Sequence, residues 1–132
     1  MTDILVSKDD GQVVTLTLND APANCLTMEM MSAIKMEIDR VNKSKDHKLV
    51  IFESSNEKIF CSGHSFNEVQ EMIKNNDKKS QELLFAECSE MLMKIRTSPK
   101  IFVAKVRGIA TAGGLGLVSI MDCVFSSKSA RF

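Results

Sequence analysis

The sequence lacks an excess of charge of either sign. Its 17 basic and 17 acidic residues give a formal net charge of +0 at pH 7. A nucleic-acid backbone is bound mainly by clustered lysine and arginine. The two densest basic stretches, residues 43–48 and 74–79, are interrupted by Asp46 and Asp77 and are expected to be solvated loops. We therefore expect no nucleic-acid partner.

The sequence also lacks any C-x-x-C pair. Its four cysteines are widely spaced along the chain, at Cys25, Cys61, Cys88 and Cys123. Zinc sites and disulfide frameworks usually show closely paired cysteines. We expect reduced, buried thiols in a reducing compartment and no metal site.

No apolar run approaches the length of a membrane span, so we expect no membrane-spanning segment. The N-terminal stretch MTDILVSKDDGQ has neither the apolar core of a secretory signal nor the arginine-rich character of a transit peptide. These features favour the cytoplasm, or the mitochondrion if a targeting peptide has been removed.

The 132 residues, 44% of them hydrophobic, have the size and composition of one domain with one core. Strand-like and helix-like segments alternate along the chain, and Asp10-Gly11 predicts a tight turn between two opening strands. This alternation predicts an α/β fold with a mainly parallel sheet. We expect strands at 13–18, 49–53, 101–106 and 123–126 in one sheet, and helices near 28–42, 80–97 and 114–121.

Helix boundaries follow from capping residues and from apolar spacing. Thr27 is expected to cap the first helix, and Ser80 to begin the long one that Pro99 ends. The first helix carries apolar residues at helical spacing, which predicts a buried stripe of Met31, Ile34, Ile38 and Val41.

Two glycine-containing segments each lie between a strand and a helix. They are FCSGHSFNE at residues 60–68, where Ser65 and Glu68 form a capping-box pattern, and ATAGGLG at 110–116. Each is expected to present free backbone N–H groups, and two such donors on one oxygen form an oxyanion hole. The alternative is that both are only tight turns. Neither fits the dinucleotide-binding fingerprint.

Three stretches carry a resemblance to a known family: LTLNDAPANCLTMEMMSAI, KIFCSGHSFNEV, and the segment from Pro99 to the C-terminus. In this order they resemble signatures of the crotonase superfamily, the enoyl-CoA hydratases and isomerases. Within it, CSGHSFNEV is most similar to the group typified by enoyl-CoA hydratase domain-containing protein 3.

The resemblance implies a spiral of ββα units that binds an acyl-CoA, with the thioester oxygen held by the backbone N–H groups of His64 and Gly113. It implies coenzyme A thioester as substrate or ligand, no other cofactor, and a homotrimer or hexamer. Residues 1–132 would form the N-terminal core domain, without the C-terminal helical part. The substrate-binding positions that it implies are Asn24, Cys25, Leu26, Gly63, His64, Ser65, Phe66, Asn67 and Gly114.

The sequence departs from the family at its catalytic acids. The position of the first glutamate is occupied by Gly116, and the second acid would lie beyond Phe132. We expect a hydratase- or isomerase-like enzyme when the protein is complete, and no activity from this chain alone. The alternative is a non-catalytic acyl-CoA-binding or interaction module.

Three other titratable side chains are alternatives to the missing acid. The imidazole of His64 is expected to face the adenine side or solvent, His47 to be exposed, and Asp122 to cap a turn.

Overall fold

Five strands form one sheet in the computed structural model, which describes residues 3–132. Buried and outward-facing residues alternate along the three central strands. The first two residues of the predicted domain lie outside the described part. In chain order the elements are β1 (Leu5–Asp10), β2 (Val13–Leu18), α1 (Met28–Lys43), β3 (Leu49–Ser54), β4 (Ile59–Cys61), α2 (Phe66–Lys74), α3 (Lys78–Thr97), β5 (Ile101–Val106), β6 (Ile109–Ala110), α4 (Gly113–Ser119) and β7 (Cys123–Ser126).

The main sheet has the strand order β1-β2-β3-β5-β7. Strands β1 and β2 form the predicted antiparallel hairpin, in which Gly11 adopts a φ of +60°, and the other pairs are parallel. All four predicted strands therefore share one sheet, and the mainly parallel α/β prediction is confirmed. A second, two-stranded parallel sheet of β4 and β6 was not predicted, because three and two residues are too few to show a pattern.

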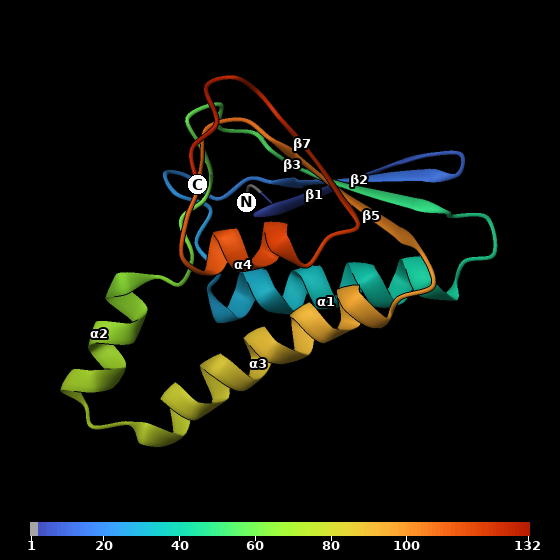
Figure 1. Ribbon diagram of the computed structural model, residues 1–132. Coiled ribbons are helices and arrows are strands. Elements are labelled where there is room, and N and C mark those ends of the chain that lie inside the picture. Colours follow the sequence, from blue (N-terminus) through green and yellow to red (C-terminus); the bar gives the residue numbers. More distant parts are fainter. Residues whose placement is uncertain (1–2) are drawn as a thin grey trace.

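Helix α1 begins and is buried as its sequence predicts. The side chain of Thr27 accepts a hydrogen bond from the amide of Met30, which caps the helix. The predicted apolar stripe is fully buried, and Met30 joins it. Figure 1 shows α1 and α4 on one face of the sheet, while α2 and the first half of α3 extend away from the sheet.

Helix α3 begins earlier than predicted. The side chain of Asp77 accepts from the amide of Ser80 at 3.0 Å and from its hydroxyl at 2.6 Å. Asp77 is therefore the N-cap and the helix starts at Lys78, so the prediction that Ser80 begins it is wrong. At the other end, the helix stops at Thr97, two residues before Pro99, as expected.

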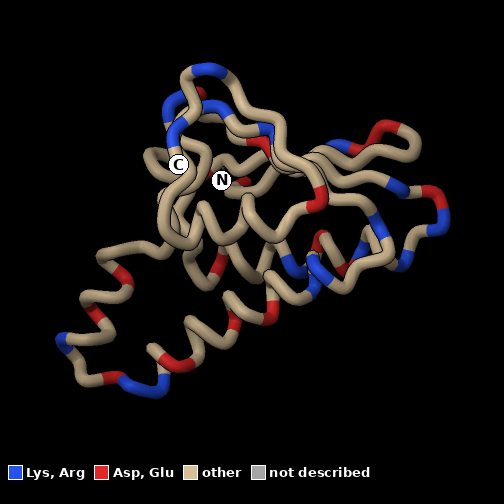
Figure 2. The backbone as a smooth tube through the Cα atoms, in the orientation of Figure 1, with Lys and Arg blue, Asp and Glu red and all other residues tan. Residues whose placement is uncertain are grey.

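Ion pairs join α1 to the middle and the second half of α3. Lys35 bonds to Glu87 and lies 3.0 Å from Glu90, and Lys94 lies 2.8 Å from Asp39. Figure 2 shows acidic and basic residues along these helices. These pairs link α1 to α3, which carries Phe85.

Helix α4 runs from Gly113 to Ser119 and ends two residues before the predicted boundary. The amide of Met121 donates to the carbonyl of Val118, three residues back, which tightens the last turn. Leu117 and Val118 are buried, while Leu115 is 40% exposed, so α4 packs by one face only. Among residues 3–132, no helix combines the length and apolarity needed to cross a membrane.

Candidate functional site

Gly63 connects β4 to α2 in a left-handed conformation, with a φ of +90°. A Cβ atom on Gly63 would lie 2.8 Å from the amide nitrogen of Gly113 and 3.1 Å from Cβ of Ala112. Such approaches leave no room for a side chain. Glycine is therefore required here, and the two glycine-containing segments, about 50 positions apart in the sequence, are in direct contact.

The second segment turns into α4 through Ala112. This residue has a φ of +50°, which is uncommon for a residue with a Cβ, and it provides no side-chain cap. Sequence reasoning missed it, because alanine carries no signal for that conformation. Two residues on, a Cβ on Gly114 would lie 2.1 Å from the carbonyl oxygen of Cys61, so Gly114 is needed for α4 to approach β4.

The backbone amides of the two segments differ in their pairing. The amide of Gly114 donates to Thr111 at 2.8 Å, and that of Thr111 donates to Cys61 at 3.1 Å. Within residues 3–132, neither the amide of His64 nor that of Gly113 donates a hydrogen bond to another residue. An amide without an internal acceptor remains available to water or to a ligand.

The imidazole of His64 turns toward the segment that precedes α1. Its Nδ1 atom lies 3.2 Å from the carbonyl oxygen of Leu26. The ring of Phe85, from α3, packs against it at right angles, with centroids 5.5 Å apart. The side chain is half-buried, so the expectation that it faces the adenine side or solvent stays a prediction. Phe85 was missed because helical spacing alone does not reveal which residue of α3 reaches this site.

The segment before α1 is tied to the β4–α2 turn by backbone and side-chain bonds. The amide of Leu26, a fully buried residue, donates to the carbonyl of Gly63 at 2.8 Å. The Cys25 sulfur lies 3.4 Å from the hydroxyl of Ser62. The segment before α1, the β4–α2 turn and the start of α4 are thus brought together.

Asn24 is a buried residue that stabilises this arrangement through hydrogen bonds. It is 1% exposed and adopts a φ of +48°. Its side-chain nitrogen donates to Ser54 Oγ at 2.8 Å and to the carbonyl of Phe60 at 3.0 Å, and its oxygen accepts from the amide of Asp20 at 2.7 Å. Its polar side-chain atoms are all engaged in this network, which gives Asn24 a positioning role.

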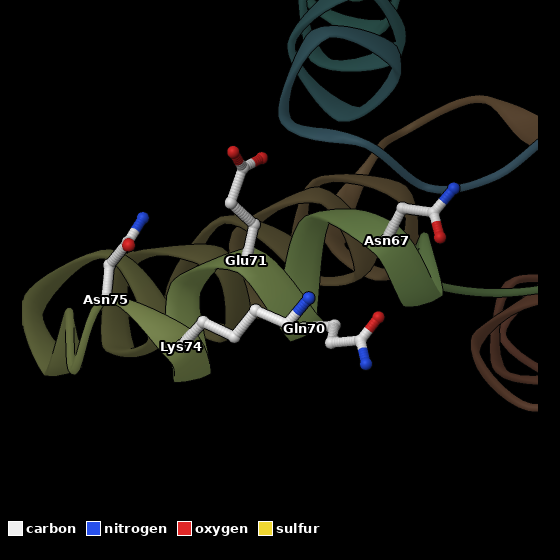
Figure 3. Close-up of a pocket in the computed structure, with 5 residues that line it drawn as sticks. All are labelled: Asn67, Gln70, Glu71, Lys74 and Asn75. Atoms are coloured by element: carbon white, nitrogen blue, oxygen red, sulfur yellow. The ribbon is translucent and has the colours of Figure 1, made fainter.

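The remaining predicted site residues lie at the start of α2. Ser65 accepts from the amide of Glu68 at 3.3 Å and caps the helix as predicted, while Phe66 is 76% exposed. Asn67 lies on the side of α2 that borders a polar cavity of about 340 Å³ (Figure 3). The cavity is lined by Asn67, Gln70, Glu71, Lys74 and Asn75. It includes neither His64 nor Gly113.

Gly116 lies in the first turns of α4 and is half-buried. A Cβ built at this position meets no atom within 4 Å. A longer side chain could therefore occupy the space, yet the chain places no carboxylate there. This position contributes no acid or base.

His47 is not exposed as predicted. Its side chain is 12% exposed, and Nε2 lies 3.2 Å from a carboxylate oxygen of Asp9. Asp9 also pairs with Arg40, whose guanidinium holds the pKa of that carboxyl below its usual range. His47 thus belongs to a polar cluster between β1 and α1.

Asp122 joins two strands of the main sheet. Its carboxylate accepts from the amide of Phe102 at 2.8 Å, and its own amide donates to the carbonyl of Phe102 at 3.0 Å. The expectation that Asp122 caps a turn is therefore wrong, because its carboxylate bonds to the start of β5. Both oxygen and amide serve the backbone, which leaves Asp122 a structural role.

The cysteines are free thiols, as predicted, but only Cys61 is buried. Burial raises the pKa of its thiol to about 11, which keeps it protonated at neutral pH. Cys25 and Cys88 are half-buried, and Cys123 is exposed, because β7 lies at the edge of the sheet. The described residues hold no group of three metal-ligating side chains.

Comparison with known sequences gives one family. The sequence profile described as enoyl-CoA hydratase/isomerase matches residues 8–132. Enoyl-CoA hydratase domain-containing protein 3, mitochondrial, from Rattus norvegicus is 30% identical over 125 residues. That match covers 95% of this chain and 40% of the relative, so the chain spans well under half the length of the curated relative.

Comparison with solved structures gives the same fold. An enoyl-CoA hydratase from Mycobacterium smegmatis superimposes with a TM-score of 0.91 and 33% identity, over 99% of this chain and 50% of that one. Human enoyl-CoA hydratase domain-containing protein 3 gives a TM-score of 0.89 and 25% identity, over 97% of this chain and 49% of that one. The predicted crotonase-type architecture and the predicted resemblance are both confirmed.

Proposed function

Because the chain belongs to the enoyl-CoA hydratase/isomerase family, we propose that it binds the thioester group of an acyl-CoA and polarises the thioester carbonyl with the backbone N–H groups of His64 and Gly113. The observation that carries the proposal is the contact between the two segments. The amide nitrogen of Gly113 lies against Gly63, the residue directly before His64. Neither amide has an acceptor within residues 3–132.

Two fixed N–H donors on one carbonyl oxygen stabilise the negative charge that develops there when an enolate forms. The donors need not reorganise, because their backbone is held by the bond from Leu26 to Gly63 and by the required glycines at 63 and 114. Glycine at 113 also leaves the approach to its amide free of a side chain. These features favour carbonyl polarisation as the chemical contribution of this part of the protein.

The other predicted substrate-binding positions fall into two groups under this proposal. Asn24, Gly63 and Gly114 shape the backbone, while Cys25, Leu26 and the start of α2 at Ser65, Phe66 and Asn67 border the place where the acyl-CoA would lie. Phe66 in particular presents 76% of its surface to solvent.

Glycine at position 116 limits the chemistry that this chain can perform, because it provides no acid or base. Water addition needs a general base or acid at the double bond, and such a group typically contributes 10²- to 10⁴-fold in rate. Position 116 provides none, so the proposal for this chain is binding and enolate stabilisation. The same observation favours the second candidate, a non-catalytic acyl-CoA-binding module. Turnover of a short enoyl-CoA by the protein distinguishes the two.

The proposal is tested by binding of butyryl-CoA to a matched pair of variants, Gly113→Pro and Gly113→Ala. Both add a Cβ, which would lie 3.3 Å from Cδ1 of Leu26, but only proline removes the N–H group. We expect calorimetry to show weaker binding for Gly113→Pro than for Gly113→Ala, with circular dichroism confirming that both are folded. Binding as tight in folded Gly113→Pro as in the unchanged protein would remove Gly113 from the site.

A further inference from the structure

The imidazole of His64 lies beside the two amides of the proposed site. Its Cδ2 atom is 3.7 Å from the position that a Cβ on Gly113 would occupy. Nε2 is bonded to Cδ2 in the ring, so the Nε2 edge lies next to the segment that carries the Gly113 amide. His64 therefore brings both a backbone donor and a titratable side chain to the same place.

The partner of Nδ1 determines which ring nitrogen can accept a proton. Nδ1 lies 3.2 Å from the carbonyl oxygen of Leu26. A carbonyl oxygen only accepts hydrogen bonds, so Nδ1 carries the hydrogen in this contact. In the neutral imidazole the lone pair is then on Nε2. Within residues 3–132, Nε2 makes no hydrogen bond that would occupy this lone pair.

The ring is also held in place. Phe85 packs against it at an interplanar angle of 82°, and Leu26, which supplies the carbonyl, is fully buried and bonded to Gly63. A base contributes most when its orientation is fixed before the substrate binds. The packing from α3 and the bond to Leu26 provide that fixed orientation.

We propose that Nε2 of His64 is the base that removes the α-proton of a bound β,γ-unsaturated acyl-CoA. This inference rests on the proposed function, because it needs the thioester in the site. It supplies within this chain the proton acceptor that Gly116 lacks. Histidine suits the role because one ring nitrogen can accept a proton while the other donates a hydrogen bond.

The step balances within the site. The Cα–H bond breaks and a bond from hydrogen to Nε2 forms, which makes the imidazolium. The electron pair moves into the thioester, and its oxygen becomes the enolate oxygen that the amides of His64 and Gly113 hold. The imidazolium then returns a proton to Cα, or to the γ-carbon, and the starting charge state is restored. No oxidant, reductant or metal ion takes part in this step.

The test is deuterium uptake at Cα of 3-butenoyl-CoA in D₂O, followed by mass spectrometry. His64→Asn keeps a side-chain amide that can donate to Leu26 in place of Nδ1 but has no basic nitrogen. His64→Gln removes the basic nitrogen in a longer side chain and serves as the second variant. The matched control is His47→Asn, which changes the chain's other histidine, on the far polar cluster with Asp9.

We expect the two His64 variants to lose uptake by roughly 10²-fold or more, while His47→Asn keeps it. Binding of the same thioester, measured by calorimetry, distinguishes a failure of the base assignment from a failure of the proposed function. If the folded His64 variants bind and exchange like the unchanged protein, the base assignment is wrong and the proposed function stands. If the unchanged protein binds without uptake, the base assignment is again overturned. If it does not bind, both proposals fail.

Discussion

The amide of Leu26 donates a 2.8 Å hydrogen bond to the carbonyl of Gly63. This bond joins the segment before α1 to the turn between β4 and α2. Because the same turn touches Gly113, three parts of the chain that are distant in sequence meet around one peptide unit. The geometry of the candidate site depends on this meeting, and several expected outcomes follow from it.

Gly63→Ala is expected to disturb the site and the fold. The added Cβ would lie 2.8 Å from the Gly113 nitrogen at a φ of +90°, so backbone must move in both segments. We expect a loss of about 2–4 kcal/mol in the free energy of unfolding, measured with urea. Gly11→Ala is the matched control, since its φ is +60° but no atom lies within 4 Å. It should cost only about 1–2 kcal/mol. Equal losses in the two variants would show that the contact with Gly113 is unimportant.

Asn24→Ala is expected to destabilise the protein through unpaired polar groups. It leaves the amide of Asp20, the hydroxyl of Ser54 and the carbonyl of Phe60 without their bonds to this side chain. The loss of buried partners should lower the free energy of unfolding by about 2–4 kcal/mol. Asn75→Ala, at an exposed position that ends α2, should change it by about 0.5 kcal/mol or less. A small effect at Asn24 would contradict the positioning role.

Cysteine reactivity should follow exposure and thiol pKa. Burial raises the pKa of Cys61 to about 11, so at pH 8 only about one thiol in a thousand is ionised, and the thiolate is the reactive form. Cys123 is exposed. Alkylation by iodoacetamide at pH 8, mapped by mass spectrometry, should modify Cys123 long before Cys61. Rapid modification of Cys61 in the folded protein would mean that β4 is not packed as described.

Gly116→Glu is expected to be tolerated. A Cβ at this position meets no atom within 4 Å, and glutamate is a better helix former than glycine by several tenths of a kcal/mol. The free energy of unfolding should therefore stay the same or rise slightly. If the carboxylate reaches a water beside the bound thioester, hydration of crotonyl-CoA should increase, and Gly116→Gln is the control that lacks the charge. A large loss of stability would show that the space is not open.

Local sequence patterns predicted much of the fold. The strands β2, β3 and β5 alternate buried and outward residues, and Thr27 and Ser65 mark helix starts, so these elements were predicted correctly. The start of α3 was misplaced because both Asp77 and Ser80 can cap, and only the observed bonds decide between them. The sheet of β4 and β6 was too short to leave a pattern.

The sequence predicted the candidate site only in part, because the site is made of contacts between segments that are distant in the sequence. The glycine-rich sequences indicated where the chain turns, but the contact of Gly63 with Gly113 and the packing of Phe85 on His64 depend on the tertiary fold. The burial of His47 by Asp9 of β1 is another such contact. Assembly as a trimer or hexamer, and location in the cytoplasm or the mitochondrion, stay predictions.

Polarisation of a thioester carbonyl by the amides of His64 and Gly113 is tested directly by difference infrared spectroscopy of butyryl-CoA labelled with ¹³C at the thioester carbonyl. On binding, the carbonyl band should move to lower frequency, and this shift should be kept in Gly113→Ala and much reduced in folded Gly113→Pro. A bound thioester whose band stays at its solution frequency, or shifts as far in folded Gly113→Pro as in the unchanged protein, would show that these amides do not polarise the carbonyl.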